Sequence, residues 1–221
     1  MVPSPLLVWQ LADSAFPTGG FAHAGGLEAA AQLGEVRGPA GLARFAEETL
    51  WNAGTFALPF ASAAHREVAA FPFLDGRCDA YTPWHVANRA SRAQGQAFLR
   101  AAEAAFGGPA AELAQLVRRE RLPGHLAPAT GAVLGALGVP IAMAQRLVLH
   151  LALRGVLSAG VRLGLAGPLE AQEIQARLGT QAEEVVAACG RLGVEDAAQA
   201  TPLLDLFQGH QDRLYSRLFQ S

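Results

Sequence analysis

The chain has 221 residues, a formal net charge of −2 and a hydrophobic fraction of 51%. The length is enough for one domain to bury a core of its own, and the lack of a basic excess argues against binding to nucleic acid. The basic residues other than histidine are all arginines, which excludes a Schiff-base lysine and the lysine of a phosphate-binding P-loop on this chain.

The first 34 residues predict a short apolar segment, a turn and a helix. The segment "PSPLLVWQLADS" ends at Asp13 and Ser14, two residue types that favour turns and helix caps. The following "AFPTGG" interrupts any helix, because Pro17 lacks an N–H and the glycines permit positive φ. We expect a helix over residues 21–33, closed by Gly34.

Breaker residues divide the next part of the chain. Residues 38–71 predict two helical stretches, jointed near Gly54 or Pro59. The segment "PFLDGRCDAYTPW" predicts a loop, with Pro83 at the start of the next helix. That helix is predicted to be long, over residues 84–106, and the "GGP" after it ends it.

The second half also reads as helical. Helices are predicted over 110–121, 127–137 and 140–164, and residues 167–193 predict two more helices or one kinked helix. The tail is amphipathic, with a predicted apolar face of Leu203, Phe207, His210, Leu214 and Leu218. No segment alternates as a strand does, so we expect a single all-α domain over 1–221, a bundle of roughly eight to ten helices.

Cysteine usage and hydropathy indicate a soluble cytoplasmic protein. Cys78 and Cys189 lie far apart and outside any CxxC motif, so we expect reduced, buried thiols. The N-terminus has no basic segment before its apolar run, which argues against a signal peptide. The most hydrophobic stretch, 131–166, carries several arginines and a histidine, which a lipid bilayer tolerates poorly.

The glycine-rich stretch "SAFPTGGFAHAGGLEAA" is the most unusual local pattern. A P-loop or a dinucleotide-binding fingerprint needs fixed glycine spacing after a strand, and this stretch has neither that spacing, nor the strand, nor a lysine. A turn that leads into a helix is the remaining interpretation, with Gly25 and Gly26 allowing another backbone to approach closely.

The sequence contains no recognisable catalytic or metal-binding motif. No GxSxG nucleophile motif is present, and Ser14 beside Asp13 indicates turn chemistry. Adjacent glutamates such as Glu47 and Glu48 do not face each other on a helix. The histidines show no HExxH spacing and no partner cysteine, although they could converge in three dimensions or across a dimer; they are His23, His65, His85, His125, His150 and His210.

Arg146, His150 and Arg154 recur every four residues within the apolar stretch, so a helix would place them on one strip. Two interpretations remain open for this strip. It is either a solvated face with extended side chains, or a polar groove or partner-facing surface.

Both chain ends resemble the UreF family of urease accessory proteins, which help urease to acquire its nickel centre. The resemblance lies in "LADSAFPTGGFAHAGGLEAA" near the start and in "PLLDLFQGHQDRLYSRLFQS" at the end. Weaker similarity lies between them, in "SRAQGQAFLR" through Gly95 and in the spacing from His125 to Gly131. The chain departs from the family pattern at Ala24, Gln211 and Gln220.

This resemblance implies an all-helical homodimer that acts with other proteins and has no catalytic residues of its own. The implied partners are UreD (UreH in some organisms), the nickel-carrying GTPase UreG and apo-urease. The protein would bridge UreD and UreG without being an enzyme, during GTP-dependent nickel insertion. It implies no tightly bound cofactor and no metal ligands on this chain, since the complex handles the nickel.

The resemblance also implies that both ends face partners. The residues carried over are Phe16, Pro17, Gly19, Gly20, Phe21, His23 and Glu28 near the start, and Leu214, Tyr215, Arg217, Leu218 and Phe219 in the tail. A buried aromatic residue can dominate an interface, which fits a tail that ends in Leu-Phe. The same tail would also fit a core helix.

Two alternatives remain. One is a regulator that donates an arginine to the GTPase, for which Arg66, Arg89 and Arg92 are candidates because they lie on polar faces. The other is a metal-dependent enzyme that uses the dispersed histidines.

Overall fold

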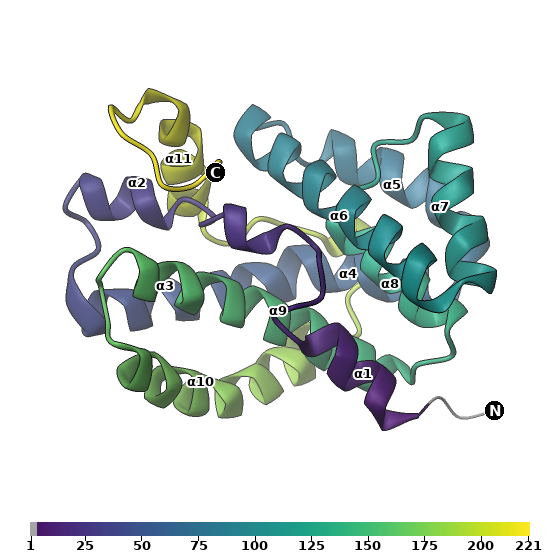
Figure 1. Ribbon diagram of the computed structural model, residues 1–221, viewed down its shortest axis with the longest axis horizontal. Helices are drawn as coiled ribbons and strands as arrows, with labels where there is room; N and C mark the ends of the chain where they lie inside the picture. Colours follow the sequence, from purple (N-terminus) through teal and green to yellow (C-terminus); the bar gives the residue numbers. More distant parts are fainter. Residues whose placement is uncertain (1–3) are drawn as a thin grey trace.

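The computed structural model describes residues 4–221, and this part of the chain is helical without a strand (Figure 1). The α-helices are α1 (Pro5–Ala12), α2 (Leu27–Gln32), α3 (Gly38–Asn52), α4 (Leu58–Arg66), α5 (Phe71–Ala80), α6 (His85–Phe106), α7 (Gly108–Glu120), α8 (Leu126–Ala136), α9 (Ile141–Arg162), α10 (Pro168–Cys189) and α11 (Pro202–His210). The predicted all-α class is confirmed. Because α3 runs into α4 without a break, these helices form ten separate rods, within the predicted number.

The apolar helix α9 lies at the centre of the fold, where it packs against α3, α4 and α10. It is long and apolar enough to span a membrane by length and composition, but much of its apolar surface is buried against these neighbours. Leu149 and Leu153 of α9 are in the core with Leu42 of α3 and Leu178 of α10. The hydropathy of this helix is therefore explained by its central position.

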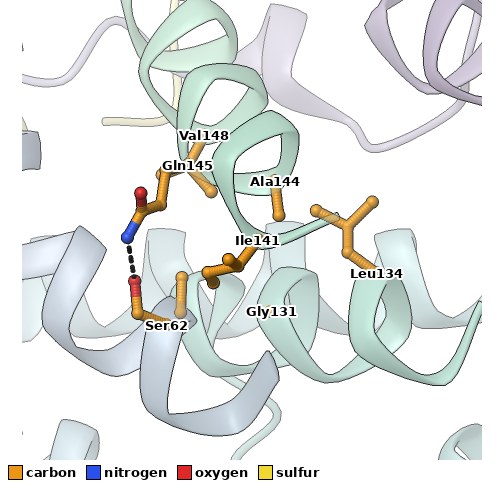
Figure 2. A pocket seen from close by; sticks show the side chains of 8 residues that line it. Ser62, Gly131, Leu134, Ile141, Ala144, Gln145 and Val148 are labelled. Atoms are coloured by element: carbon orange, nitrogen blue, oxygen red, sulfur yellow. Dashed lines mark hydrogen bonds between the residues drawn. The ribbon is translucent and has the colours of Figure 1, made fainter. Parts of the chain in front are cut away.

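A second core cluster joins α5, α6, α7 and α8, with Phe98 fully buried inside it. Here α4 and α8 cross so closely that a Cβ at Gly131 would overlap the carbonyl of Ala61. Figure 2 shows the filled space beside this crossing, where the Gln145 amide nitrogen donates to Ser62 Oγ at 3.0 Å. The space holds no volume for a water-sized molecule, so it is core rather than a ligand site.

The joint predicted near Gly54 is present as a π-helical turn, Ala53–Ala57, between α3 and α4. Gly54 faces α10, where a Cβ would overlap the side chain of Val185. The extra residue in the turn changes the helix phase, as π-turns do. Within residues 167–193 a single helix forms, α10 (Pro168–Cys189), in place of the two that the sequence also allowed.

Three predictions of local structure were wrong. The loop predicted at "PFLDGRCDAYTPW" is largely helix α5, since Pro72 occupies its first turn and Phe71, Leu74, Asp75 and Cys78 bury one helical face. The helix expected from residue 21 begins only at Leu27. Gly25 and Gly26 have φ values of +60° and +89° and break it.

The third error concerns the tail, which the sequence predicted as an amphipathic helix with one apolar face. Helix α11 ends at His210, and after a 3₁₀ turn the chain is irregular from Leu214 onward. Leu204 is the buried leucine of this helix and Leu203 is exposed. Farther along the tail, the N–H groups of Leu218 and Phe219 bond to the Glu28 side chain of α2 instead of to helix carbonyls.

Candidate functional site

The last residues of the chain lie next to the segment that precedes α2 (Figure 1). We call this segment, residues 21–28, and the tail, residues 211–221, the joined ends. The Ala24 N–H donates to the Ser221 carbonyl at 2.6 Å, and the Gln220 N–H donates to the Ala22 carbonyl at 2.8 Å. Between these bonds, His23 Nδ1 lies 2.8 Å from Ser221 Oγ. The structure thus brings together the two segments that carry the sequence resemblance.

A buried carboxylate fastens the tail to α2. Glu28 is 2% exposed, and its Oε1 accepts the Leu218 N–H at 2.6 Å. Its Oε2 accepts the Phe219 N–H at 3.0 Å and the Gln211 side-chain amide at 2.7 Å. We call Glu28, Gln211, Leu218 and Phe219 the tail clasp. Three N–H donors compensate the carboxylate for the water that it has lost.

Close backbone packing accompanies the clasp. Gly26 directly precedes α2, and a Cβ at this position would lie 2.9 Å from the backbone nitrogen of Gln208 in α11. With φ at +89°, the position also disfavours any residue with a side chain. The close approach that the sequence predicted for the glycine pair is therefore confirmed at Gly26, while Gly25 has open space around its Cα.

Helix α9 holds both chain ends through one arginine. The Arg162 guanidinium lies 4.3 Å from the centroid of the Phe219 ring, a cation–π contact, and it donates to the Phe21 carbonyl. Phe219 is 3% exposed and belongs to the core cluster around α9. The last aromatic residue of the tail is therefore a core residue in this chain.

Ion pairs tie the tail to α6 on the outside. Asp212 accepts from Arg89 at 2.9 Å and from Arg217 at 3.0 Å, and His85 Nε2 lies 3.2 Å from the same carboxylate. The Arg89 guanidinium, with His85, lowers the pKa of Asp212. These side chains are largely solvated, so each pair contributes little to stability.

The predicted partner-facing residues separate into buried and exposed groups. Phe16, Glu28 and Phe219 are buried, and Gly19, Gly20, His23 and Leu214 are half-buried. Phe16 packs against Phe98 and Phe106, with ring centroids 5.9 and 6.1 Å away. The exposed members are Pro17, Phe21, Tyr215, Arg217 and Leu218. Contact of any of these residues with a partner stays a prediction.

Comparison with known proteins identifies the family. The UreF family model matches residues 36–179, about two thirds of the chain. The chain belongs to the UreF family. It is 38% identical over 216 residues to Urease accessory protein F of Oryza sativa subsp. indica, an alignment that covers 96% of this chain and 83% of the rice protein.

Two further relatives support the assignment. Urease accessory protein F of Arabidopsis thaliana is 37% identical over 220 residues, which is 96% of this chain and 91% of the plant protein. Urease accessory protein UreF of Agrobacterium fabrum is 31% identical over 228 residues, with 98% and 95% covered. The resemblance inferred from the chain ends is thereby confirmed over nearly the whole length.

The two weaker UreF-like segments of the middle also meet in space. A Cβ at Gly95 of α6 would overlap the Gly124 carbonyl and the backbone of His125, so α6 and the start of α8 touch through their backbones. Buried Asp75 accepts the N–H groups of Gly124 and His125 at 2.8 and 2.7 Å. Burial raises the pKa of Asp75. Gly95 and His125 therefore lie at a close crossing between α6 and the start of α8.

Serine, histidine and aspartate come together at this crossing, but their geometry fits bracing. His125 Nδ1 lies 3.0 Å from Ser91 Oγ, and Nε2 lies 2.9 Å from Asp79 Oδ1. Ser91 Oγ already accepts the Leu126 N–H, and the His125 ring is completely buried. These contacts hold the start of α8 against α5 and α6.

The other histidines of this UreF-family chain are dispersed. His65 Nε2 lies 2.6 Å from the Val139 carbonyl, and His150 is half-buried, with its pKa lowered by burial and by Arg154. Within residues 4–221 no three His, Cys, Asp or Glu side chains are grouped to hold a metal ion. Cys78 and Cys189 are buried free thiols, as expected, and burial raises the pKa of Cys78 to about 12.

The arginine strip on α9 is occupied by contacts within the chain. Arg146 pairs with Glu183 of α10 at 2.6 Å, and Arg154 donates to the Ala12 carbonyl at the end of α1. The arginine therefore meets the negative end of the α1 dipole. The strip fastens α10 and α1 to α9, which favours neither of the two interpretations that were left open.

Sequence reasoning missed Arg162, Gln211 and Asp212, which position the tail. Gln211 was visible only as a departure from the family pattern. Arg162 carried no local signal, because its partners lie far away in the sequence, and the contact of Asp212 with α6 is equally remote. Only the folded arrangement shows what these side chains do.

Proposed function

We propose that this protein is a non-enzymatic adaptor that bridges UreD (UreH) and the GTPase UreG during GTP-dependent nickel insertion into apo-urease. Membership of the UreF family supports a role in urease maturation and interaction with other maturation components. We further propose that it acts as a homodimer in the cytoplasm. Nickel is the cargo of the assembled complex, and no tightly bound cofactor is part of the proposal.

One observation carries the adaptor proposal: the joined chain ends expose apolar side chains over a well-packed base. Phe21 is 76% exposed and Leu218 is 53% exposed, while Arg162 donates to the Phe21 carbonyl and Glu28 accepts the Leu218 N–H. Exposed large apolar side chains on a fixed backbone are typical of interface anchors. A bridging protein needs such surfaces and no reaction centre.

The adaptor proposal is tested by pull-down of purified UreD and UreG from the same organism with the tagged full chain. We expect the wild-type protein to retain both partners, and the Phe21→Ala and Leu218→Ala variants to retain less UreD, by about tenfold in affinity for a central anchor. Leu169→Ala is the matched control, because Leu169 is 81% exposed on α10, away from the joined ends. Retention of neither partner by the wild-type chain would refute the proposal.

A second proposal, regulation of GTP hydrolysis by UreG, is supported by the exposure of Arg66 and Arg92. The third candidate, Arg89, is paired with Asp212 and would have to leave that carboxylate to reach a nucleotide. Single Arg→Ala variants should slow GTP hydrolysis in the complex if one of them stabilises charge on the transferred phosphoryl group. Unchanged hydrolysis together with lost nickel insertion would exclude this role.

A further inference from the structure

We infer that Glu28 is a positioning residue, which fixes the conformation of the tail and so presents residues 214–218 to a partner in a pre-ordered form. The resemblance placed Glu28 among the partner contacts, but its carboxylate is almost completely buried under the tail of its own chain. Its ligands are three N–H groups, two of them from consecutive backbone positions. Only the expected effect of Glu28 on partner affinity rests on the proposed adaptor function.

The arrangement requires a carboxylate in particular. Both oxygens accept: Oε1 accepts the Leu218 N–H, while Oε2 accepts the Phe219 N–H and the Gln211 amide. Glutamine has one carbonyl oxygen, so it would turn an N–H donor toward at least one of these donors. A Glu28→Gln variant therefore keeps the size of the side chain, but it can no longer accept hydrogen bonds at both oxygen positions.

Few other contacts hold the exposed part of the tail. Residues 214–218 lie outside any helix. Besides the bond to Glu28, they make a 3.0 Å hydrogen bond from the Gln32 side chain to the Ser216 carbonyl and a long turn bond from the Leu214 N–H. Arg217 also forms a surface ion pair with Asp212. A bond to a solvated group stabilises little. Among the contacts that residues 214–218 themselves make, the bond from the Leu218 N–H to the buried carboxylate is therefore the strongest.

Pre-ordering has a direct effect on binding. A segment that is already fixed does not lose conformational entropy when a partner binds it, which improves affinity without any new contact. Glu28 would thus influence partner affinity although it is too deeply buried to touch a partner. The expected partner is a protein with an apolar surface, because the segment that the tail clasp positions exposes the large side chains of Tyr215 and Leu218.

The first test is amide hydrogen exchange, followed by mass spectrometry on the full chain without partners. In Glu28→Gln we expect exchange in peptides covering residues 211–221 to speed up by at least about tenfold, since a charged acceptor is lost, while peptides from α9 exchange as in the wild type. Glu112→Gln, an exposed glutamate on α7, is the control and should change neither. Unchanged tail exchange, or equal acceleration throughout the chain, would overturn the inference.

The second test separates positioning from contact by a double-variant cycle with UreD. We expect Glu28→Gln to weaken binding in the wild-type background and to have a smaller effect in the Leu218→Ala background, because Glu28 acts through the tail residues that it positions. Equal weakening in both backgrounds would overturn the positioning role. If the wild type does not bind UreD at all, the adaptor proposal fails, while the exchange experiment still decides whether Glu28 orders the tail.

Discussion

At the scale of single residues, the chain ends show how one side chain can replace regular secondary structure. The N–H groups of Leu218 and Phe219 would bond to carbonyls in a helix, but they bond to Glu28. Helical periodicity in the tail therefore predicted a structure that the buried carboxylate prevents. Periodicity reports which residues prefer burial, and it cannot report that an acceptor from α2 competes for the backbone.

His23 supplies a prediction about pH at the same scale. Burial, and then the Arg89 charge, lowers the pKa of His23 below its ordinary value of 6.5. The folded chain therefore favours neutral His23, whereas the unfolded chain takes up the proton as the pH falls through 6.5. Stability contributed by neutral His23 is complete above pH 6.5 and decreases below it.

We expect the contribution of His23 to the free energy of unfolding to decrease between pH 7.5 and 5.5, and exchange of the tail amides to accelerate over the same interval. In His23→Asn, which keeps a polar atom near Ser221 Oγ and cannot titrate, the acceleration at the tail should be smaller than in the wild type. Urea denaturation and hydrogen exchange at both pH values measure this. Identical pH profiles for the tail in the two proteins would show that His23 does not couple protonation to the joined ends.

At the scale of elements, close helix crossings determine which glycines cannot be replaced. Gly95 lies where α6 meets the backbone before α8, whereas Gly179 of α10 has open space around its Cα. Both lie within helices of equal length, so intrinsic helix propensity favours alanine to the same degree at each position. The difference in stability between alanine variants at Gly95 and Gly179 therefore measures the effect of the close helix crossing.

We expect Gly95→Ala to destabilise the protein by about 2 kcal/mol or more, because a methyl group must push the helices apart. Gly179→Ala should stabilise it by about 0.5–1 kcal/mol through helix propensity. Thermal and urea denaturation of both variants provide the comparison. Equal effects of the two substitutions would contradict the close crossing of α6 and α8.

The elements also show how far the sequence alone could predict the fold. The long helices α6, α8 and α9 were predicted within a few residues of their ends, because Pro and Gly residues flank long apolar periodic segments. Helix α5 was missed because its glycine and aspartates resemble a loop. One of those aspartates, Asp75, is buried and bonded to the chain before α8, so the polar residue that indicated a loop is a tertiary contact.

At the scale of the whole molecule, the sequence predicted the participants of the candidate site better than their roles. It selected both chain ends, and the structure joins them. It could not separate the residues that join the two segments, such as Glu28 and Phe219, from those left exposed, such as Phe21 and Tyr215. Whether a residue is buried or exposed there depends on its contacts with a segment nearly 200 positions away in the sequence. No local sequence pattern contains this information.

Oligomeric state is the remaining prediction at this scale. The proposed homodimer should have twice the 23.1 kDa mass of one chain in sedimentation equilibrium. Because the tail clasp lies within one chain, Glu28→Gln should leave this mass unchanged even where it loosens the tail. A mass of one chain at every concentration up to about 100 µM, far above a typical stable dimer's dissociation constant, would contradict the homodimer. A dimer that dissociates in Glu28→Gln would instead show that the ordered tail forms part of the subunit contact.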